Sequence, residues 1–379
     1  MKFSYWENKT WLSNIDFVIV GSGIVGLNCA LELRAKYPKS KIVVLEKGLI
    51  PHGASSRNAG FACFGSLTEI ISDLDSHSPS EVYDLIHKRV SGLGRLRKLF
   101  GDKQIKYKQF GGNEIFLQKD LEKFHNSIDK IDEINKLIKP LFNDKVFELN
   151  KNKFHFQNIL EKVVFNKFEG QIDTGEMMDA LLNKAYSLNI KIINNVSVDS
   201  YDDIGPSVKV YTNQFTVSCN KLFIATNGFS QSIIQEKVVP ARAQVLITKP
   251  IKNLKVIGTF HFQQGYYYFR NIDDRILLGG GRNLDFHTEN TTEFGVTDTI
   301  QSKLEELLTD VILPQNNFEI EQRWSGIMGV GNKKTTITKQ LSNNVYCGVR
   351  LGGMGIAIGT NIGSELANLI WYITTFKAL

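Results

Sequence analysis

One short stretch constrains the fold of this chain more than any other, the glycine pattern G-x-G-x-x-G at residues 21–26. The apolar run over 15–20 before it predicts a β-strand, and residues 24–35 after it have the composition of a helix. A second apolar run, 41–45, ends in Glu46, about 20 residues after the last glycine. Strand, glycine turn, helix, second strand and acidic residue in this order predict a βαβ unit that binds a dinucleotide.

Each part of the pattern has a separate physical task. Gly21 permits the tight turn, Gly23 lets the backbone approach a pyrophosphate, and Gly26 lets the helix lie close to the strand. The unpaired N–H groups at the start of the helix attract the phosphate, and Glu46 accepts hydrogen bonds from a ribose. The predicted nucleotide site also includes the neighbouring residues Ser22, Ile24, Val25 and Lys47.

Composition narrows the class of protein. The 379 residues are 42% hydrophobic, which is enough for a large core and favours two intertwined domains. The net charge of +6 is spread along the chain without a dense basic tract, so the sequence does not favour nucleic-acid binding. The cysteines have no metal-like spacing, which argues against zinc and disulfides and is typical of a reducing cytoplasm. They are Cys29, Cys63, Cys219 and Cys347.

No membrane span and no signal peptide are expected. The segment before the first strand carries Glu7 and Lys9 in place of a basic region with a cleavage site. The apolar segment 362–376 contains Glu365 and Asn368, which favours an amphipathic helix packed on a sheet.

Strands of two characters are interleaved further along the chain. Residues 221–228 read as a buried strand ending in a small-residue turn, whereas 240–249, 258–263 and 275–280 alternate like strands of an antiparallel sheet. Residues 121–138 predict one charged amphipathic helix closed by Pro140. Because the two kinds of strand are interleaved, we expect discontinuous domains.

At this point the residues resemble a known family, the FAD enzymes that include D-amino-acid oxidase, glycine oxidase and sarcosine oxidase. The resemblance extends over nearly the whole chain, and the order and spacing of its motifs are more specific than any one of them. Within the family, the S-x-R-N-x-G loop and the Trp-Ser-Gly turn are most similar to the γ-glutamylputrescine oxidase branch. The motifs are the glycine pattern, 57–60, 224–228, 240–244, 276–280, 323–326 and 352–355.

The resemblance implies an α/β fold with a Rossmann-like FAD-binding domain and an α+β substrate domain built on a large mixed or antiparallel sheet. The FAD-binding domain would comprise residues 1–80, 150–235 and 325–379, and the substrate domain 81–149 and 236–324. The implied reaction is oxidation of a C–N bond of a small amine or N-alkyl amino compound. Hydride passes to flavin N5, and water then hydrolyses the imine.

The resemblance also implies which segments contact FAD. Ser55, Ser56, Arg57, Asn58, Ala59 and Gly60 would wrap its flavin end, and the backbone at Val196 would meet the adenine. Ala225, Thr226, Asn227 and Gly228 would close over the pyrophosphate or ribose. Gly352, Gly353, Met354, Gly355 and Ile356 would present N–H groups to the flavin pyrimidine edge, with Arg350 as an added cation or an ordinary surface residue.

Two departures from the family pattern concern substrate and cofactor attachment. Amino-acid-oxidising members carry a Gly-Leu-Arg-Pro turn whose arginine clamps the substrate carboxylate, and here Met328 takes that place. We therefore expect an amine or N-alkyl substrate over a free α-amino acid, unless Arg323 substitutes from a neighbouring position. The cysteine that anchors FAD in monomeric sarcosine oxidases has no counterpart near the Trp-Ser-Gly turn, which predicts non-covalent FAD.

Aromatic residues add a last group of candidates. Strand alternation places Tyr266 and Tyr268 on one face, where they could line an amine site or simply pack. Only one dinucleotide pattern is visible, so oxygen or an electron carrier would reoxidise the flavin. Two other functions stay open, a tRNA-base-modifying FAD oxidase and a flavin-binding subunit without turnover of its own. The sequence leaves the oligomeric state undetermined.

Overall fold

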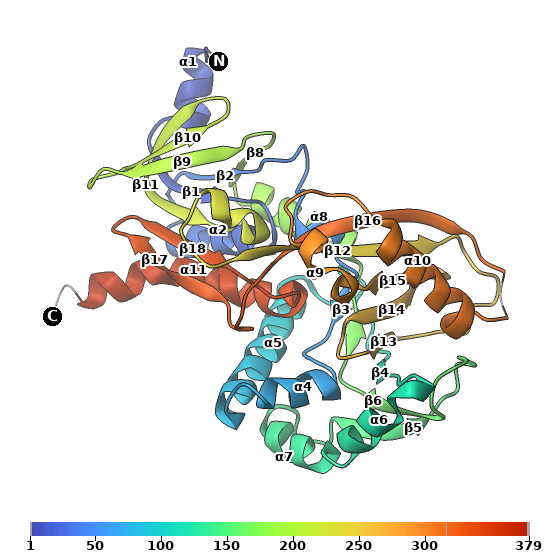
Figure 1. Ribbon diagram of the computed structural model, residues 1–379. Helices are drawn as coiled ribbons and strands as arrows, with labels where there is room; N and C mark the ends of the chain where they lie inside the picture. The colour runs from blue at the N-terminus through green and yellow to red at the C-terminus, as the bar shows by residue number, and fades with distance from the viewer. Residues whose placement is uncertain (1, 316, 377–379) are drawn as a thin grey trace.

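Two eight-stranded sheets organise the chain in this computed structural model, which describes residues 2–315 and 317–376 (Figure 1). The first sheet has the order β17-β18-β11-β1-β2-β8, with β10 and β9 continuing from β11. Its strands are β1 (Ile15–Val20), β2 (Ile42–Leu45), β8 (Lys191–Ile193), β9 (Val198–Asp203), β10 (Val208–Thr212), β11 (Thr216–Ile224), β17 (Ile337–Ser342) and β18 (Val345–Val349).

The centre of the first sheet is parallel and covered on both faces. β1 pairs in parallel with both β2 and β11, as the apolar runs predict. Phe17 and Ile19 enter a core shared with the helices, whereas Val18 and Val20 enter a second core beneath the β9–β10 hairpin. The covering helices are α2 (Ile24–Lys36), α8 (Thr174–Ser187) and α11 (Gly355–Phe376).

The last helix packs against the first sheet and its neighbour helix, as the sequence predicts for an amphipathic segment. A Cβ on Gly348 of β18 would lie 3.1 Å from Leu366, and one on Gly363 would lie 2.6 Å from the carbonyl oxygen of Val25 in α2. Among the described residues, no helix combines the length and the apolar character that crossing a membrane requires.

The second sheet is mostly antiparallel, with the order β16-β12-β15-β14-β13-β4-β6-β5, and only its β13–β4 pair is parallel. One face packs against α10 (Asp298–Leu307) and the following turn η5 (Leu308–Ile312), and the other faces the first lobe of the molecule (Figure 1). Its strands are β4 (Gly112–Glu114), β5 (Phe147–Lys151), β6 (Lys162–Asn166), β12 (Val239–Thr248), β13 (Thr259–Phe262), β14 (Tyr267–Ile272), β15 (Arg275–Gly280) and β16 (Ile320–Val330).

A helical layer at the lower end of the molecule joins the two lobes (Figure 1). It comprises α4 (Leu67–Leu74), α5 (Pro79–Phe100), α6 (Leu121–Ile128) and α7 (Ile131–Phe142). The remaining short elements are α1 (Tyr5–Glu7), η1 (Asn8–Leu12), α3 (Ala54–Arg57), β3 (Phe61–Ala62), η2 (Gln118–Asp120), β7 (Gly170–Gln171), η3 (Asn227–Ser232), η4 (Arg282–Leu284) and α9 (Phe286–Glu289).

The fold class is confirmed, and three boundaries differ from the sequence-based expectation. The single helix expected over 121–138 is two helices, and Pro140 lies inside α7. The break lets Phe124 of α6 and Ile134 of α7 enter the same core. The domain boundary expected at residue 150 falls within β5, and the one at 325 falls within β16, because both strands belong to the second sheet. The division into two discontinuous domains otherwise stays a prediction.

Candidate cofactor and substrate site

The glycine pattern forms a tight cradle where β1 ends and α2 begins. Gly21 has a φ of 101°, and a Cβ on it would lie 2.9 Å from the carbonyl oxygen of Ala225. A Cβ on Gly23 would lie 2.8 Å from the Ser55 hydroxyl, and one on Gly26 only 1.9 Å from the Gly21 carbonyl oxygen. All three positions therefore require glycine for close approach, in agreement with the roles predicted for them.

Glu46 ends β2 with its carboxylate buried beside this cradle. Its Oε2 accepts hydrogen bonds from the Ser22 amide at 3.0 Å and the Ser22 hydroxyl at 2.7 Å, and its Oε1 accepts one from the Gly48 amide. The Val196 amide donates to the Glu46 carbonyl oxygen at 2.9 Å, which brings the backbone predicted to meet the adenine to the same edge. Lys47 turns away, with its Nζ over the Phe229 ring.

The end of β11 closes the cradle from the other side. The Ala225 amide donates to the Val20 carbonyl oxygen, and the Asn227 side chain accepts from the Arg350 and Leu351 amides. The Thr226 Oγ1 atom is buried and has no hydrogen-bond partner among the described residues. A hydroxyl left unpaired beside a glycine cradle fits the phosphate or ribose oxygens of the FAD that the resemblance implies.

The loop at residues 55–60 lies across the cradle and reaches the second sheet. The Ser55 hydroxyl accepts a hydrogen bond from the Ile24 amide at 3.0 Å, at the first turn of α2. Asn58 folds back on the loop, since its Oδ1 accepts from the Gly60 amide at 2.8 Å and from the Thr174 hydroxyl. The Arg57 guanidinium donates to the Ser325 carbonyl oxygen on β16 and stacks over Phe294. Ser56 bonds only within its own loop.

The glycine turn before α11 lies beside β16. Gly352 and Gly353 have φ values of 60° and 84°, and a Cβ on Gly353 would lie 3.4 Å from the Met328 sulfur. Met354 donates its amide to the Leu351 carbonyl oxygen, and Gly355 and Ile356 begin the helix. The structure therefore brings Met328 to the segment predicted to hold the flavin pyrimidine edge.

The two arginines named from the sequence lie elsewhere. Arg350 has a φ of 64° and directs its guanidinium to the carbonyl and hydroxyl oxygens of Thr335, away from the turn. Arg323 lies on the α10 side of β16, where it bonds Gln301 at 2.8 Å and pairs with Glu305 at 2.9 Å. Neither position brings the side chain to Met328, so a substrate role for either arginine stays a prediction without support from this geometry.

The structure separates the two candidate tyrosines. β14 begins only at Tyr267, so alternation does not extend back to Tyr266, which is 40% exposed in a turn and contacts Phe286. The expectation that Tyr266 and Tyr268 share a face is therefore wrong. Tyr268 faces the first lobe and meets Phe61 edge-to-face at 5.5 Å, in a cluster with Ala59. Burial raises the pKa of Tyr268 to about 12, so its phenol stays protonated.

Sequence reasoning missed a buried polar group on the same sheet face. His261 stands opposite Tyr268 on β13, and Glu114 on β4 stands opposite His261. The His261 Nε2 atom lies 3.1 Å from Glu169, which also accepts from the Thr259 hydroxyl. Because each is one polar residue within an otherwise apolar strand, only strand register reveals that they adjoin.

Charge coupling perturbs the titration of this group. Burial alone lowers the pKa of His261, but the charge and hydrogen bond of Glu169, with Glu69 and Glu114, raise it to about 9. Burial raises the pKa of Glu114 to about 7 against the hydrogen bonds from Thr68. Cys63, Glu169 and His261 each place one potential metal-ligand atom within 4.8 Å of the others. Since burial raises the pKa of the Cys63 thiol and Glu169 is already hydrogen-bonded, this group is best described as a buried ion pair.

Known proteins share both the sequence pattern and the fold. Residues 16–369 match the DAO family, described as FAD dependent oxidoreductase. "Probable oxidoreductase OrdL" of Haemophilus influenzae is 20% identical over 387 residues, which cover 95% of this chain and 84% of that protein. Glycine oxidase from Bacillus cereus superposes with a TM-score of 0.75 at 17% identity, covering 95% of this chain and 96% of that one. L-proline dehydrogenase from P. horikoshii gives 0.73 at 18% identity, with coverages of 94% and 93%.

Proposed function

This chain belongs to the DAO family of FAD dependent oxidoreductases, and we propose that it oxidises a C–N bond of a small amine or N-alkyl amino compound. The cofactor of the family is FAD, and the glycine cradle, the Glu46 carboxylate and the unpaired Thr226 hydroxyl suit its ADP half. We infer that FAD is bound non-covalently, because β16 carries no cysteine near Trp324.

One observation carries the proposal: three predicted FAD-binding segments converge on a single face of the second sheet. A Cβ on Gly326 of β16 would lie 3.3 Å from Arg57 of the 55–60 loop, and Met328 adjoins Gly353 of the final turn. Phe61, next to that loop, packs on Tyr268 of β14. A flavin held by these segments would meet a sheet face that carries aromatic and buried polar side chains. Such a pocket suits an enzyme that orients a small organic molecule.

The bound FAD would supply the chemistry, which is acceptance of a hydride from the carbon next to the substrate nitrogen. The chain's own residues then have three tasks. Phe61 and Tyr268 wall the site and exclude water, and the sheet orients the C–H bond. The N-terminus of α11, at Gly355, stabilises negative charge near the flavin pyrimidine edge. Met328 contributes an apolar surface, which favours an N-alkyl group beside it.

Anaerobic mixing with a substrate panel tests the proposal. The purified protein should be yellow, and acid precipitation should release FAD into the supernatant. At least one member of a panel of primary amines, secondary amines, amino acids and N-methyl amino acids should bleach the flavin without oxygen. The reduced protein then identifies its oxidant, which we propose to be oxygen or a one-electron carrier.

The two other functions give different results in the same experiment. A tRNA-base oxidase would be reduced by a nucleic-acid substrate or partner and by no member of the panel. A flavin-binding subunit would hold FAD and be bleached by neither. Either result would contradict the proposal, whereas bleaching by a small amine supports it.

A further inference from the structure

Arg270 on β14 is a buried cation without a counterion. Only 2% of its surface is exposed, and its Nε atom has no hydrogen-bond partner. Within residues 2–315 and 317–376, its guanidinium makes no hydrogen bond and no ion pair. A guanidinium has five N–H donors, and burying them unpaired is costly unless something else supplies acceptors.

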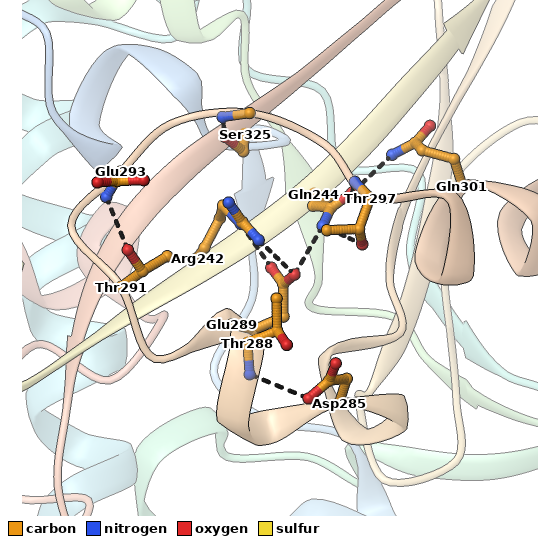
Figure 2. Close-up of polar contacts among 11 residues, drawn as sticks. Arg242, Gln244, Asp285, Thr288, Glu289, Thr291, Glu293, Thr297, Gln301 and Ser325 are labelled. Atoms are coloured by element: carbon orange, nitrogen blue, oxygen red, sulfur yellow. Dashed lines mark hydrogen bonds and ion pairs between the residues drawn. The ribbon is translucent and has the colours of Figure 1, made fainter.

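The same sheet shows how this chain treats another buried arginine. Arg242 on β12 makes a bidentate pair with Glu289, at 2.9 and 2.8 Å, and Gln244 donates to the same carboxylate (Figure 2). Glu289 is fully buried, so the pair is a complete internal network on the α10 side of the sheet. Arg270, on the other side, has no equivalent of Glu289.

Nearby carboxylates do not compensate the charge of Arg270. Burial lowers the pKa of Arg270 to about 10, with Asp173 and Asp273 acting in the opposite direction, so the group stays charged at neutral pH. Asp173 already pairs with Lys106 at 3.4 Å and accepts the Glu176 amide at the start of α8. Asp273 lies in the turn after β14. The buried charge therefore lacks a partner in direct contact.

The guanidinium points at the loop that we assign to the flavin. A Cβ on Gly60 would lie 2.8 Å from the Arg270 Nη2 atom and 3.1 Å from its Cζ. Arg270 is two residues beyond Tyr268 and stands opposite Leu277 of β15, which belongs to the cluster with Ala59. Its unpaired donors therefore lie on the face where the substrate is proposed to bind.

We propose that Arg270 binds a compact oxyanion of the substrate, such as a carboxylate, and so determines which amino compounds this chain accepts. The inference rests on the proposed function and narrows its substrate class to amino compounds that carry an anionic group. It also changes the meaning of Met328: the absence of an arginine on β16 does not leave the site without a cation, because β14 supplies one. A guanidinium favours this class of ligand because its fork matches two carboxylate oxygens.

Binding to the oxidised holoenzyme tests the inference without turnover. Acetate and benzoate should perturb the flavin absorption spectrum, whereas acetamide and benzamide should not. Arg270→Met should keep its FAD and weaken benzoate binding on the order of 10–100-fold, as expected for hydrogen bonds to a charged group. Arg270→Lys should fall between the two, because it keeps the charge and loses the fork. Arg275→Met, which removes an exposed arginine paired with Glu321, is the matched control and should bind benzoate like the wild type.

Three results would overturn the inference. Equal binding of benzoate and benzamide would show that no oxyanion is recognised, and unchanged benzoate binding by Arg270→Met would show that Arg270 is not the site. The anion could also be the reduced flavin, which sulfite addition to the oxidised flavin reports. Weaker sulfite addition by Arg270→Met with benzoate binding intact would assign the cation to the cofactor.

A stability measurement separates ligand binding from a structural role. Removing an unpaired buried charge should leave the thermal midpoint of the Arg270→Met holoenzyme unchanged or higher in carboxylate-free buffer. A fall of more than about 5 °C would mean that the guanidinium stabilises the fold and would contradict the inference. If wild-type protein binds benzoate but no amine reduces it, the proposed function fails while this site stands, so the two failures are distinguishable.

Discussion

Trp324 donates its indole N–H to the carbonyl oxygen of Arg57 at 3.0 Å. This hydrogen bond joins β16 of the second sheet to the loop that crosses the nucleotide cradle, and the Arg57 guanidinium returns a bond to Ser325 on the same strand. The two lobes are therefore fastened together beside the proposed flavin, and the position of the loop depends on the second sheet.

Trp324→Phe tests whether this bond positions the cofactor loop. Phenylalanine keeps the apolar packing and removes one hydrogen bond worth about 1 kcal/mol, so the FAD dissociation constant should rise about five-fold. Equilibrium dialysis against FAD measures it. Trp11→Phe, at an exposed position outside the site, should leave the affinity unchanged. Equal affinities for the two variants would show that the bond does not position the loop.

Thr226→Val tests the unpaired hydroxyl at the end of β11. If Oγ1 contacts FAD, the variant should bind FAD about ten-fold more weakly, because a hydrogen bond to the cofactor is lost. The cofactor-free protein should be stabilised by about 1 kcal/mol, since a buried unpaired group is removed. Urea unfolding and FAD titration measure the two effects.

Thr248→Val is the control for that experiment. The Thr248 hydroxyl accepts the Ile276 amide in the second sheet, so this variant should lose stability on the order of 1–3 kcal/mol and keep its FAD affinity. A Thr226→Val protein that loses stability and keeps FAD affinity would behave like the control and contradict the assignment.

His261 should make stability depend on pH above neutrality. Its pKa is raised from 6.5 to about 9, so its contribution is fully present below about pH 6.5 and is lost as the pH rises through 9. A rise of this size corresponds to a loss on the order of 3 kcal/mol in the free energy of unfolding across that interval. Urea unfolding at saturating FAD should show the decline in the wild type and a much smaller one in His261→Gln.

Two comparisons make the His261 prediction specific. The raised pKa of Glu114, about 7, predicts a separate loss between about pH 4.5 and 7, which His261→Gln should retain in direction. His125→Gln, on the exposed side of α6, should keep the full decline above neutrality. If that decline survives in His261→Gln as well, the ion pair with Glu169 is not its source.

Arg323→Ala should have a small effect on catalysis. The side chain pairs with Glu305 on the α10 side of the sheet, so its loss should cost no more than about 1 kcal/mol of stability, as for partly exposed pairs. Steady-state kinetics with the best amine should give a kcat/KM within about two-fold of the wild type, since less than 0.5 kcal/mol of transition-state binding is at stake. A ten-fold loss in kcat/KM would place Arg323 at the substrate after all.

The local parts of the site could be predicted from the sequence, because their physics is local. Glycine spacing determines the cradle at Gly21 and Gly26, and the apolar run before Glu46 determines where that carboxylate lies. The loop at 55–60 and the turn at 352–355 follow from the resemblance, and the structure brings both to the second sheet.

The polar side of the substrate site could not be predicted, because it depends on strand register. His261, Glu114 and Tyr268 become neighbours only through the pairing of three strands, one of them more than 140 residues away in sequence. Arg350 was misplaced for a different reason, since its left-handed backbone conformation directs the side chain away from the turn. Arg270 gives no signal in the sequence at all, since an arginine in a strand more often lies at the surface.

The most direct test of the account is the rate of anaerobic flavin reduction by the best amine and by the same amine deuterated at the carbon next to nitrogen. The account predicts that deuteration slows flavin bleaching several-fold in stopped-flow absorbance, because the C–H bond breaks in that step, and that a carbonyl product appears in proportion to the flavin reduced. Bleaching at the same rate for both amines, with no carbonyl product, would contradict the oxidation of a C–N bond.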